Sequence, residues 1–383
     1  MKSSDMNVRN AVSGSTEFPW RWKLEDLDKR PKNGRIVFSC FSCGGGSSMG
    51  YKLAGYTVIG NCEIDPEMMK VYRLNNHPKY SFLMDIRDFL SLPDEEIPEE
   101  LRDLDILDGS PPCSVFSMAG RRDEGWNVEK TFREGQAKQR LDDLFFYFID
   151  LAKRLRPKVV IAENVRGLIT GSARGWVNRI VKAFDSAGYS VQIFLFNAAK
   201  MGVPQKRERV FFIASRKDLG LPKLKMVFDS KPVPFSAVRE PYGKPLSDDA
   251  LASKLLKYRL PTDRDLSDIN RRVRKKYSGY TLTLAHDDEP VPTITSGGNM
   301  FRMCDGLLMT DRDIISCQTF PQDYDFAGQR IRYVCGMSVP PVMMARISEQ
   351  VWLQWLRSLK DLNKERQDPV DNDSCQKDVS TTE

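Results

Sequence analysis

A cysteine that directly follows two prolines is the residue of this sequence best suited to covalent chemistry. Cys113 comes after Ser110-Pro111-Pro112, just past the carboxyl end of an apolar strand expected at 104–107. Two prolines stiffen a loop and would present the thiol at a fixed angle. A cysteine becomes a good nucleophile where a positive environment lowers its pKa. The alternative is a buried structural cysteine, which is the commoner role of this residue type.

Charged residues adjoin two further strands that the sequence predicts. Glu163 leaves the apolar strand 159–162. A carboxylate there is costly unless it is paired or functional, and it could protonate a ring nitrogen; the alternative is a cap on the following turn. The run 205–209, Gln-Lys-Arg-Glu-Arg, precedes the strand 210–214. Its arginines could hydrogen bond a carbonyl oxygen or a phosphate, and the alternative is a surface charge cluster.

A run of three glycines lies between the first expected strand and the first expected helix. Gly44, Gly45 and Gly46 would let the backbone approach a bound nucleotide-like group closely. Glu63 follows at the end of the next strand, where a carboxylate can accept hydrogen bonds from ribose hydroxyls. The spacing departs from the G-x-G-x-x-G pattern of dinucleotide sites, so a tight structural turn is the alternative.

Strand and helix patterns alternate between residues 35 and 214, and this alternation must position the residues above. A helical pattern at 144–155, for example, ends before Pro157 and is followed by the strand 159–162. Such alternation predicts an α/β fold with a doubly wound, mostly parallel sheet. Sites in this class of fold form at the carboxyl ends of the strands.

The patterns also predict how the chain divides into domains. We expect a flexible N-terminal arm at 1–33 and a catalytic and cofactor-binding domain at 34–215. Prolines then interrupt the alternation, which predicts a second, smaller domain at 216–328. An apolar helix within 329–360 is expected to return to the first domain, and residues 361–383 lack large apolar side chains and predict a disordered tail.

Composition limits the functions that the chain can have. The sequence has 383 residues and a net charge of +6, which permits a polyanionic partner without requiring one. It contains no apolar run long enough to cross a membrane, and its start has no secretory signal. Eight scattered cysteines predict reduced thiols in a cytosol. Because only two histidines accompany them, no metal site is expected.

A basic run within the smaller domain is the strongest candidate for contact with such a partner. Five cations occur within six residues, and tyrosines flank them. A solvated face is the usual explanation of such a run, but contact with a phosphate backbone is plausible here. The five cations are Arg271, Arg272, Arg274, Lys275 and Lys276.

Taken together and in this order, the motifs resemble those of the DNA (cytosine-5) methyltransferases of bacteria and their phages. The resemblance runs from about Ile36 to Trp355, with the major motifs in unpermuted order. The segments that carry it are FSCGGGSSMGYKLAGY, CEID, MDIRDF, GSPPCSVFS, AENVRG, QKRERVFF, PTIT, TDRDIISCQTFPQDY and CGMSVPP.

The resemblance implies a Rossmann-like S-adenosylmethionine-dependent methyltransferase fold with a target-recognition domain, and it assigns roles to residues. Cys113 would be the nucleophile, Glu163 the acid at cytosine N3, and Arg207 and Arg209 the support of the flipped base and the nucleophile loop. Gln205 would join the basic run in contacting double-stranded DNA. S-adenosylmethionine would be bound by Phe41, Ser42, Gly44, Gly45, Gly46, Glu63, Ile64, Asp85, Ile86, Pro112, Leu144 and Ser338.

The resemblance also implies a setting: a bacterial cytoplasm, association with the nucleoid through DNA, a monomer on its substrate, and a cognate restriction endonuclease as a candidate partner. Three positions depart from the family pattern. Cys43 replaces a glycine of the cofactor loop, Ile64 replaces a common aromatic residue, and Met337 replaces a late asparagine.

The sequence leaves three alternative functions to consider. A tRNA cytosine-5 methyltransferase would share the fold, but its relatives tend to have threonine where this chain has Ser117. A catalytically inactive DNA-binding relative is disfavoured because Cys113, Glu163 and Arg209 are intact. A nicotinamide-dependent oxidoreductase, inferred from the glycine turn alone, would leave the Pro-Pro-Cys motif unexplained.

Overall fold

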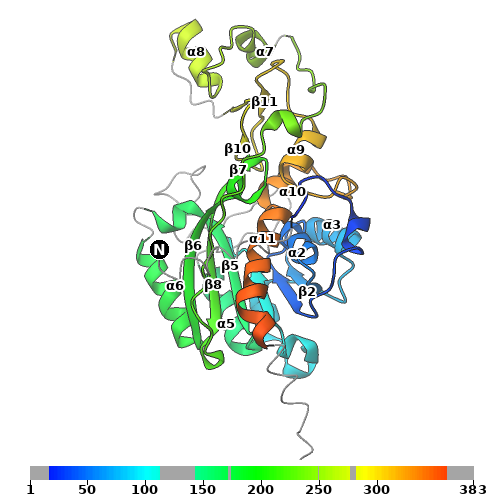
Figure 1. The fold of residues 1–383 in the computed structure, drawn as a ribbon, viewed down its shortest axis with the longest axis vertical. Coiled ribbons are helices and arrows are strands. Elements are labelled where there is room, and N and C mark those ends of the chain that lie inside the picture. Colours follow the sequence, from blue (N-terminus) through cyan, green and yellow to red (C-terminus); the bar gives the residue numbers. More distant parts are fainter. Residues whose placement is uncertain (1–16, 113–142, 171–173, 249, 277–281, 360–383) are drawn as a thin grey trace, which may run out of the picture.

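A twisted sheet of seven strands forms the centre of the molecule (Figure 1). The computed structural model describes residues 17–112, 143–170, 174–248, 250–276 and 282–359. The strands lie in the order β3-β2-β1-β4-β5-β8-β6, and β8 runs antiparallel to both of its neighbours. The prediction of an α/β fold with a mostly parallel sheet is therefore confirmed. The strands are β1 Ile36–Cys40, β2 Thr57–Glu63, β3 Tyr80–Leu83, β4 Ile106–Gly109, β5 Val159–Val165, β6 Tyr189–Asn197 and β8 Glu208–Arg216.

Successive residues of the central strands point to opposite faces of the sheet, and both faces are buried. In β1, Val37 joins one apolar core and Phe38 the other, and both side chains are fully buried. This alternation makes each central strand apolar on both sides, as a sheet covered by helices on both faces requires. The helices α2 (Gly46–Leu53) and α11 (Pro341–Val351) contribute to the first core, and α4 (Ile86–Ser91), α5 (Leu144–Leu155) and α6 (Arg174–Ser186) to the second.

Local sequence signals fix the helix boundaries next to the site. The helix α3 (Pro66–Asn76) begins after Asp65, whose side chain accepts hydrogen bonds from the backbone amides of Glu67 and Met68. Proline at its first position adds to this start signal. The helix ends at His77, which adopts a left-handed conformation. These signals place Glu63, at the end of β2, immediately before a rigid turn.

The described part of the predicted N-terminal arm is packed against the first domain. Phe18, Trp22 and Leu27 are buried in the first apolar core. The indole Nε1 of Trp22 donates a hydrogen bond to the carbonyl oxygen of Thr319, at 2.9 Å. Residues 17–33 therefore differ from the expected flexible arm, because three large apolar side chains hold them in place. Residues 1–16 lie outside the described residues.

A separate small core supports the part of the chain drawn at the top of Figure 1. It is built from the helices α7 (Leu251–Leu256) and α8 (Leu266–Arg274) and the short strands β9 (Leu284–Ala285) and β11 (Phe301–Arg302). Its buried side chains are Leu255, Leu256, Leu266, Ile269, Leu284 and Phe301.

The division of residues between the small core and the first apolar core of the sheet favours narrower limits for the smaller domain than 216–328. Leu224, Phe235, Ile314 and Phe320 lie within that range but belong to the core of the first domain. The chain therefore runs along the first domain before and after the smaller core. The domain boundaries themselves stay predictions.

The C-terminal segment forms two helices where a single one was expected. The helix α10 (Ile331–Met337) ends at Ser338, and α11 begins at Pro341 after an N-cap at Pro340. The two prolines lack the amide hydrogens that a continuous helix needs. α11 lies across α2 (Figure 1), and Gly50 permits this contact, because a Cβ there would lie 2.5 Å from the carbonyl oxygen of Pro341. The predicted tail at 361–383 lies outside the described residues.

Short elements connect the sheet domain to the small core. The strands β7 (Gln205–Lys206) and β10 (Val291–Pro292) pair in parallel, and α9 (Asp311–Cys317) leads back to the first domain. Within the described ranges, no helix has the length and apolar character needed to cross a membrane.

Candidate active site

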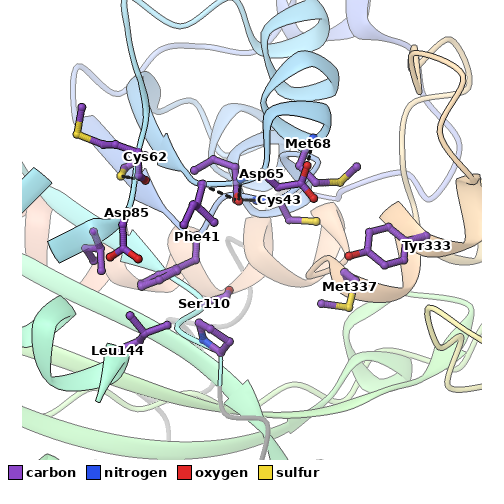
Figure 2. Close-up of a pocket in the computed structure, with 15 residues that line it drawn as sticks. Phe41, Cys43, Cys62, Asp65, Met68, Asp85, Ser110, Leu144, Tyr333 and Met337 are labelled. Carbon is purple, nitrogen blue, oxygen red and sulfur yellow. Dashed lines mark hydrogen bonds between the residues drawn. The ribbon is translucent and has the colours of Figure 1, made fainter. Parts of the chain in front are cut away.

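A cleft opens at the carboxyl ends of the parallel strands (Figure 2). About 790 Å³ of free space lies within it, including the part open to solvent. Side chains from β2, α3, α4, α5 and α10 and from the loops after β1, β3 and β4 converge on it. The lining residues are Phe41, Cys43, Cys62, Glu63, Ile64, Asp65, Met68, Met84, Asp85, Ile86, Ser110, Pro112, Leu144, Tyr333 and Met337.

The carboxylate of Glu63 is fixed by backbone amides at the wall of this cleft. Its Oε2 accepts from the amide of Cys43 at 2.7 Å, and its Oε1 accepts from Ile64 and Asp65, each at 3.0 Å. Burial raises the pKa of Glu63, and these hydrogen bonds oppose the rise. The side chain therefore links the first loop of the sheet to the turn after β2, with a rigid orientation toward the cleft.

A second carboxylate, that of Asp85, lines the same cleft among apolar side chains. Asp85 caps α4, since its Oδ1 accepts from the backbone amide of Arg87 at 2.8 Å, and its Oδ2 pairs with the guanidinium of Arg87 at 3.2 Å. Figure 2 shows Phe41 and Leu144 on the same side of the cleft as Asp85. The cleft thus combines carboxylate acceptors with flat and branched apolar surfaces.

The three glycines of the first loop lie close to other parts of the protein, and their predicted approach to the cofactor stays a prediction. They are absent from the cleft lining, as are Ser42 and Ser338. A Cβ on Gly44 would lie 2.2 Å from Val334 Cγ1 of α10, and one on Gly46 would lie 2.5 Å from the carbonyl oxygen of Val339. Their small size therefore lets the loop pack against α10 and the segment after it.

Cys43 occupies the position where the sequence departs from the family pattern. Its φ is 46°, in the left-handed region that favours glycine. Its side chain lines the cleft, and burial raises the pKa of its thiol to about 12. The residue is therefore an uncharged side chain held in a strained conformation at the wall of the cleft.

Several lining residues were missed by the sequence reasoning. Tyr333 and Met337 are four residues apart on α10, so helical spacing places both on one face. That spacing was the available signal, whereas the resemblance assigned the cofactor contact to Ser338 and marked Met337 only as a departure from the family pattern. The other lining residues outside the predicted set are Cys62, Asp65, Met68, Met84 and Ser110, and all of them except Met68 lie in segments that carry the family resemblance.

An ion pair joins the two candidate catalytic residues on β5 and β8. The Nε of Arg209 lies 2.9 Å from Oε1 of Glu163, and both side chains are largely buried. Burial lowers the pKa of Arg209, and the negative charge of Glu163 opposes this shift. Antiparallel pairing of the strands sets Val165 opposite Arg209 and so brings the two side chains together.

The residue after Glu163 ties the same strand to the proline loop. The side-chain amide of Asn164 donates to the carbonyl oxygen of Pro111 at 3.0 Å, and it is buried. Glu163 and the loop that leads to Cys113 are therefore held next to each other. Cys113 itself lies outside the described residues.

Arg207 and Gln205 are buried, and both bind backbone or amide groups. Arg207 donates to the carbonyl oxygens of Ile294 at 3.0 Å and Gly336 at 2.9 Å, and burial lowers the pKa of its guanidinium. Gln205 is fully buried and exchanges hydrogen bonds with Gln318 and the amide of Ile294. The amide of Gln205 thus joins three segments of the protein, and its expected contact with DNA stays a prediction.

The predicted basic run is exposed, and one of its side chains, Arg272, also anchors α8. Arg272 binds Oδ1 of the buried Asp263 at 2.6 Å and the carbonyl oxygen of Tyr258 at 2.6 Å. It therefore holds α8 to the preceding loop. The remaining cations lie on the exposed end of α8 or just after it, and they are Arg271, Arg274, Lys275 and Lys276.

The sheet order, the reversed β8 and the cleft at the strand ends define a Rossmann-like α/β enzyme of the methyltransferase type. The chain belongs to the C-5 cytosine-specific DNA methylase family, whose sequence model matches residues 36–352. The expected family is therefore confirmed, and with it the DNA (cytosine-5) methyltransferase class of enzyme.

Individual relatives support this assignment. The chain is 29% identical over 338 residues to the Type II methyltransferase M1.HphI of Haemophilus parahaemolyticus. The aligned residues cover 81% of this chain and 85% of that relative. The chain is 34% identical over 222 residues to M.FnuDI of Fusobacterium nucleatum, covering 57% of each. Among solved structures, DNMT2 of Spodoptera frugiperda has a TM-score of 0.58 at 15% identity, covering 83% of this chain and 100% of that one. That likeness concerns the fold.

Proposed function

We propose that this protein methylates carbon 5 of a cytosine in a specific duplex DNA sequence through a transient bond between Cys113 and carbon 6. The observation that carries this proposal is the buried Glu163–Arg209 pair, fastened through Asn164 to the loop that leads to Cys113. An acid, a cation and a nucleophile loop are thereby held at one edge of the sheet, next to the cleft.

We propose that the cleft binds S-adenosylmethionine, which supplies the methyl group. The hydrogen-bond acceptors and apolar surfaces of the cleft fit this cofactor. The carboxylate of Glu63 would accept hydrogen bonds from the ribose hydroxyls, and that of Asp85 from the adenine amino group. Phe41, Ile64 and Leu144 would contact the adenine ring. Pro112 lines the cleft one residue before Cys113, which would bring the nucleophile close to the transferred methyl group.

In the proposed reaction, the Cys113 thiolate adds to carbon 6 and the electrons of the 5,6 double bond move to carbon 5. Glu163 donates a proton or a strong hydrogen bond to N3, which stabilises the adduct. The bound S-adenosylmethionine, held by Glu63 and Asp85, would supply the methyl group to carbon 5 and would be released as S-adenosylhomocysteine. A base, such as water, then removes the proton from carbon 5, the N3 proton returns to Glu163, and the thiolate leaves as the 5,6 double bond re-forms.

Arg209 would act in this scheme by orienting Glu163, and Arg207 by fixing the backbone around it. The Nε of Arg209 holds one oxygen of Glu163. Arg207 ties the segment at Ile294 to α10 at Gly336, next to the cleft residue Met337. Both roles depend on burial, because charge-assisted hydrogen bonds are stronger where water is excluded.

The cytosine must leave the duplex to reach such a site, at a cost of a few kcal/mol of unstacking. The smaller domain would grip phosphates and read base edges in the major groove. The exposed cations at the end of α8, such as Arg274 and Lys276, are the candidates for phosphate contact. We further propose a bacterial, nucleoid-associated enzyme that acts as a monomer on DNA, with a restriction endonuclease as its partner, in keeping with the Type II names of its relatives.

The proposal is tested by trapping the covalent adduct. Duplex DNA that contains 5-fluorocytosine should form a covalent complex with the wild-type protein, and Cys113→Ala should abolish both the complex and tritium transfer from labelled S-adenosylmethionine. Cys304→Ala, which removes an exposed thiol of the smaller domain, is the matched control and should behave as wild type. Methyl transfer to tRNA but not to duplex DNA, or full activity of Cys113→Ala, would refute the proposal. Bisulfite sequencing of DNA from expressing cells would identify the target sequence.

Glu163→Gln should slow single-turnover methyl transfer by about 10²-fold, the usual contribution of a positioned acid. The substitution preserves the shape of the side chain and removes only its ability to ionise and to donate an acidic proton. An unchanged rate would show that Glu163 does not act as the acid.

A further inference from the structure

A buried carboxylate outside the catalytic set connects the two sides of the cleft. Asp108 lies in β4 and is 2% exposed. Its Oδ2 accepts from the hydroxyls of Ser39 and Ser47, each at 2.8 Å, and its Oδ1 accepts from the hydroxyl of Tyr51 at 3.1 Å. Within the described part of the chain no cation pairs with it, so three neutral donors stabilise the charge. The proposed reaction gives this group no role.

The three donors come from the elements that carry the cofactor loop. Ser39 is in β1, which leads to Phe41 and Cys43 at the wall of the cleft. Ser47 lies in the first turn of α2, directly after the glycine run, and Tyr51 follows one turn later. The carboxylate therefore holds the first turn of α2 against β1.

The strand that carries Asp108 leads to the other side of the same cleft. Two residues further along, Ser110 lines the cleft, and Pro112 does so just before Cys113. Figure 2 shows Ser110 and Cys43 on facing sides of the cleft. A single side chain thus bridges the start of the nucleophile loop and the start of the cofactor loop.

We propose that Asp108 is a positioning residue that couples the cofactor loop to the nucleophile loop, so that the two sides of the cleft keep one relative position during methyl transfer. The inference rests on the proposed function only for its kinetic consequence. The structural part of the inference, which is the coupling of α2 to β4, follows from the three hydrogen bonds alone.

The charge of this group is sensitive to pH near neutrality. Burial raises the pKa of Asp108 to about 6, and the hydrogen bonds from Ser47, Ser39 and Tyr51 oppose this shift. Other titratable groups that act on it are Glu163 of β5, Tyr72 of α3 and Cys40 of β1. All of these groups stay in place when Asp108 alone is replaced. The ratio of the wild-type to the variant binding constant or rate, measured at each pH, therefore isolates the contribution of Asp108.

The test compares Asp108→Asn with Asp105→Asn. Asp105 is also buried, just before the same strand, but it pairs with Arg35 and Lys158. At pH 7.5 Asp108→Asn should weaken S-adenosylhomocysteine binding, measured by calorimetry, and slow single-turnover methyl transfer, each by about tenfold, as expected when charge-assisted hydrogen bonds become neutral. Both ratios should approach one at pH 5, where the wild-type carboxyl is itself neutral. Asp105→Asn should show no such pH-dependent ratio.

Hydrogen exchange supplies a readout that needs no activity. In Asp108→Asn the amides of residues 44–53 should exchange faster at pH 7.5 through local opening of the first turn of α2, whereas the amides of β4, which open only with the whole fold, should not exchange faster. Ser47→Ala should produce a milder form of the same local pattern. Wild-type exchange and binding in both variants, or an Asp108→Asn defect of equal size at pH 5 and pH 7.5, would overturn the inference. If wild type transfers no methyl group to DNA, the proposed function fails, whereas the exchange pattern still decides the role of Asp108.

Discussion

The substitution Asp108→Asn should make the protein more stable at neutral pH. A carboxyl group whose pKa is higher in the folded than in the unfolded state binds protons more tightly when folded. Folding therefore gains from this group below its ordinary pKa of 3.8 and loses that gain as the pH rises through about 6. Above that pH the buried charge lowers the free energy of unfolding.

The size of the effect follows from the same two values. Each pKa unit corresponds to about 1.4 kcal/mol, so a rise from 3.8 to about 6 corresponds to roughly 3 kcal/mol. Asparagine resembles the protonated carboxyl in size and charge, and its amide can donate to Ser39 or Ser47, whose hydroxyls also accept. Roughly 3 kcal/mol is therefore the upper limit of the stabilisation expected at pH 7.5.

Urea denaturation of wild type and Asp108→Asn at pH 4, 5, 6 and 7.5 measures this difference. Other carboxyl groups titrate alike in both proteins, so their contributions cancel. The variant should gain stability relative to wild type as the pH rises, mostly between pH 4 and 6. A difference that is constant over this range, or a variant that becomes relatively less stable at pH 7.5, would show that the carboxylate is not destabilised by burial. Together with reduced activity, increased stability would indicate that the charge is retained for function.

Substitutions at four further residues test other features of the fold and the site. Trp22→Ala should lower the free energy of unfolding by about 3–5 kcal/mol in urea titrations, because a large buried side chain is lost; a change below about 1 kcal/mol would show that the N-terminal segment packs weakly. Cys43→Gly should be about 1 kcal/mol more stable than Cys43→Ala, since φ is 46° there, and equal melting curves would contradict this strain. Lys276→Ala should reduce the salt dependence of DNA binding without affecting stability, whereas Arg272→Ala should destabilise the smaller domain, and the reverse pattern would refute these roles.

Much of the catalytic centre was predictable because local sequence determines where strands end. The apolar run before Glu163 indicated a buried strand, and the structure places β5 there. Parallel strands bring their carboxyl ends to one edge of the sheet, so residues that follow different strands meet at that edge. This explains why Glu63, Asp85 and Pro112, far apart in the sequence, line one cleft.

Other features depended on contacts between distant segments. The glycine run was expected to approach a ligand, but Gly44 and Gly46 face α10 and the segment after it, nearly 300 residues away in the chain. Gln205 was expected to contact DNA, and no sequence pattern indicated that its amide would also bond with Gln318 inside the protein. Local patterns do not specify which distant surface covers a given residue.

The sequence by itself determined the family, the α/β sheet and the residue types of the site, because motifs and apolar periodicity are local properties. Tertiary structure alone decided that Trp22 packs beside Thr319 and that Arg272 is an anchor. It also brought the hydroxyls of Ser39 and Ser47 to the carboxylate of Asp108. Such partners are chosen when whole elements pack together, since the burial of apolar surface fixes which polar groups must satisfy one another.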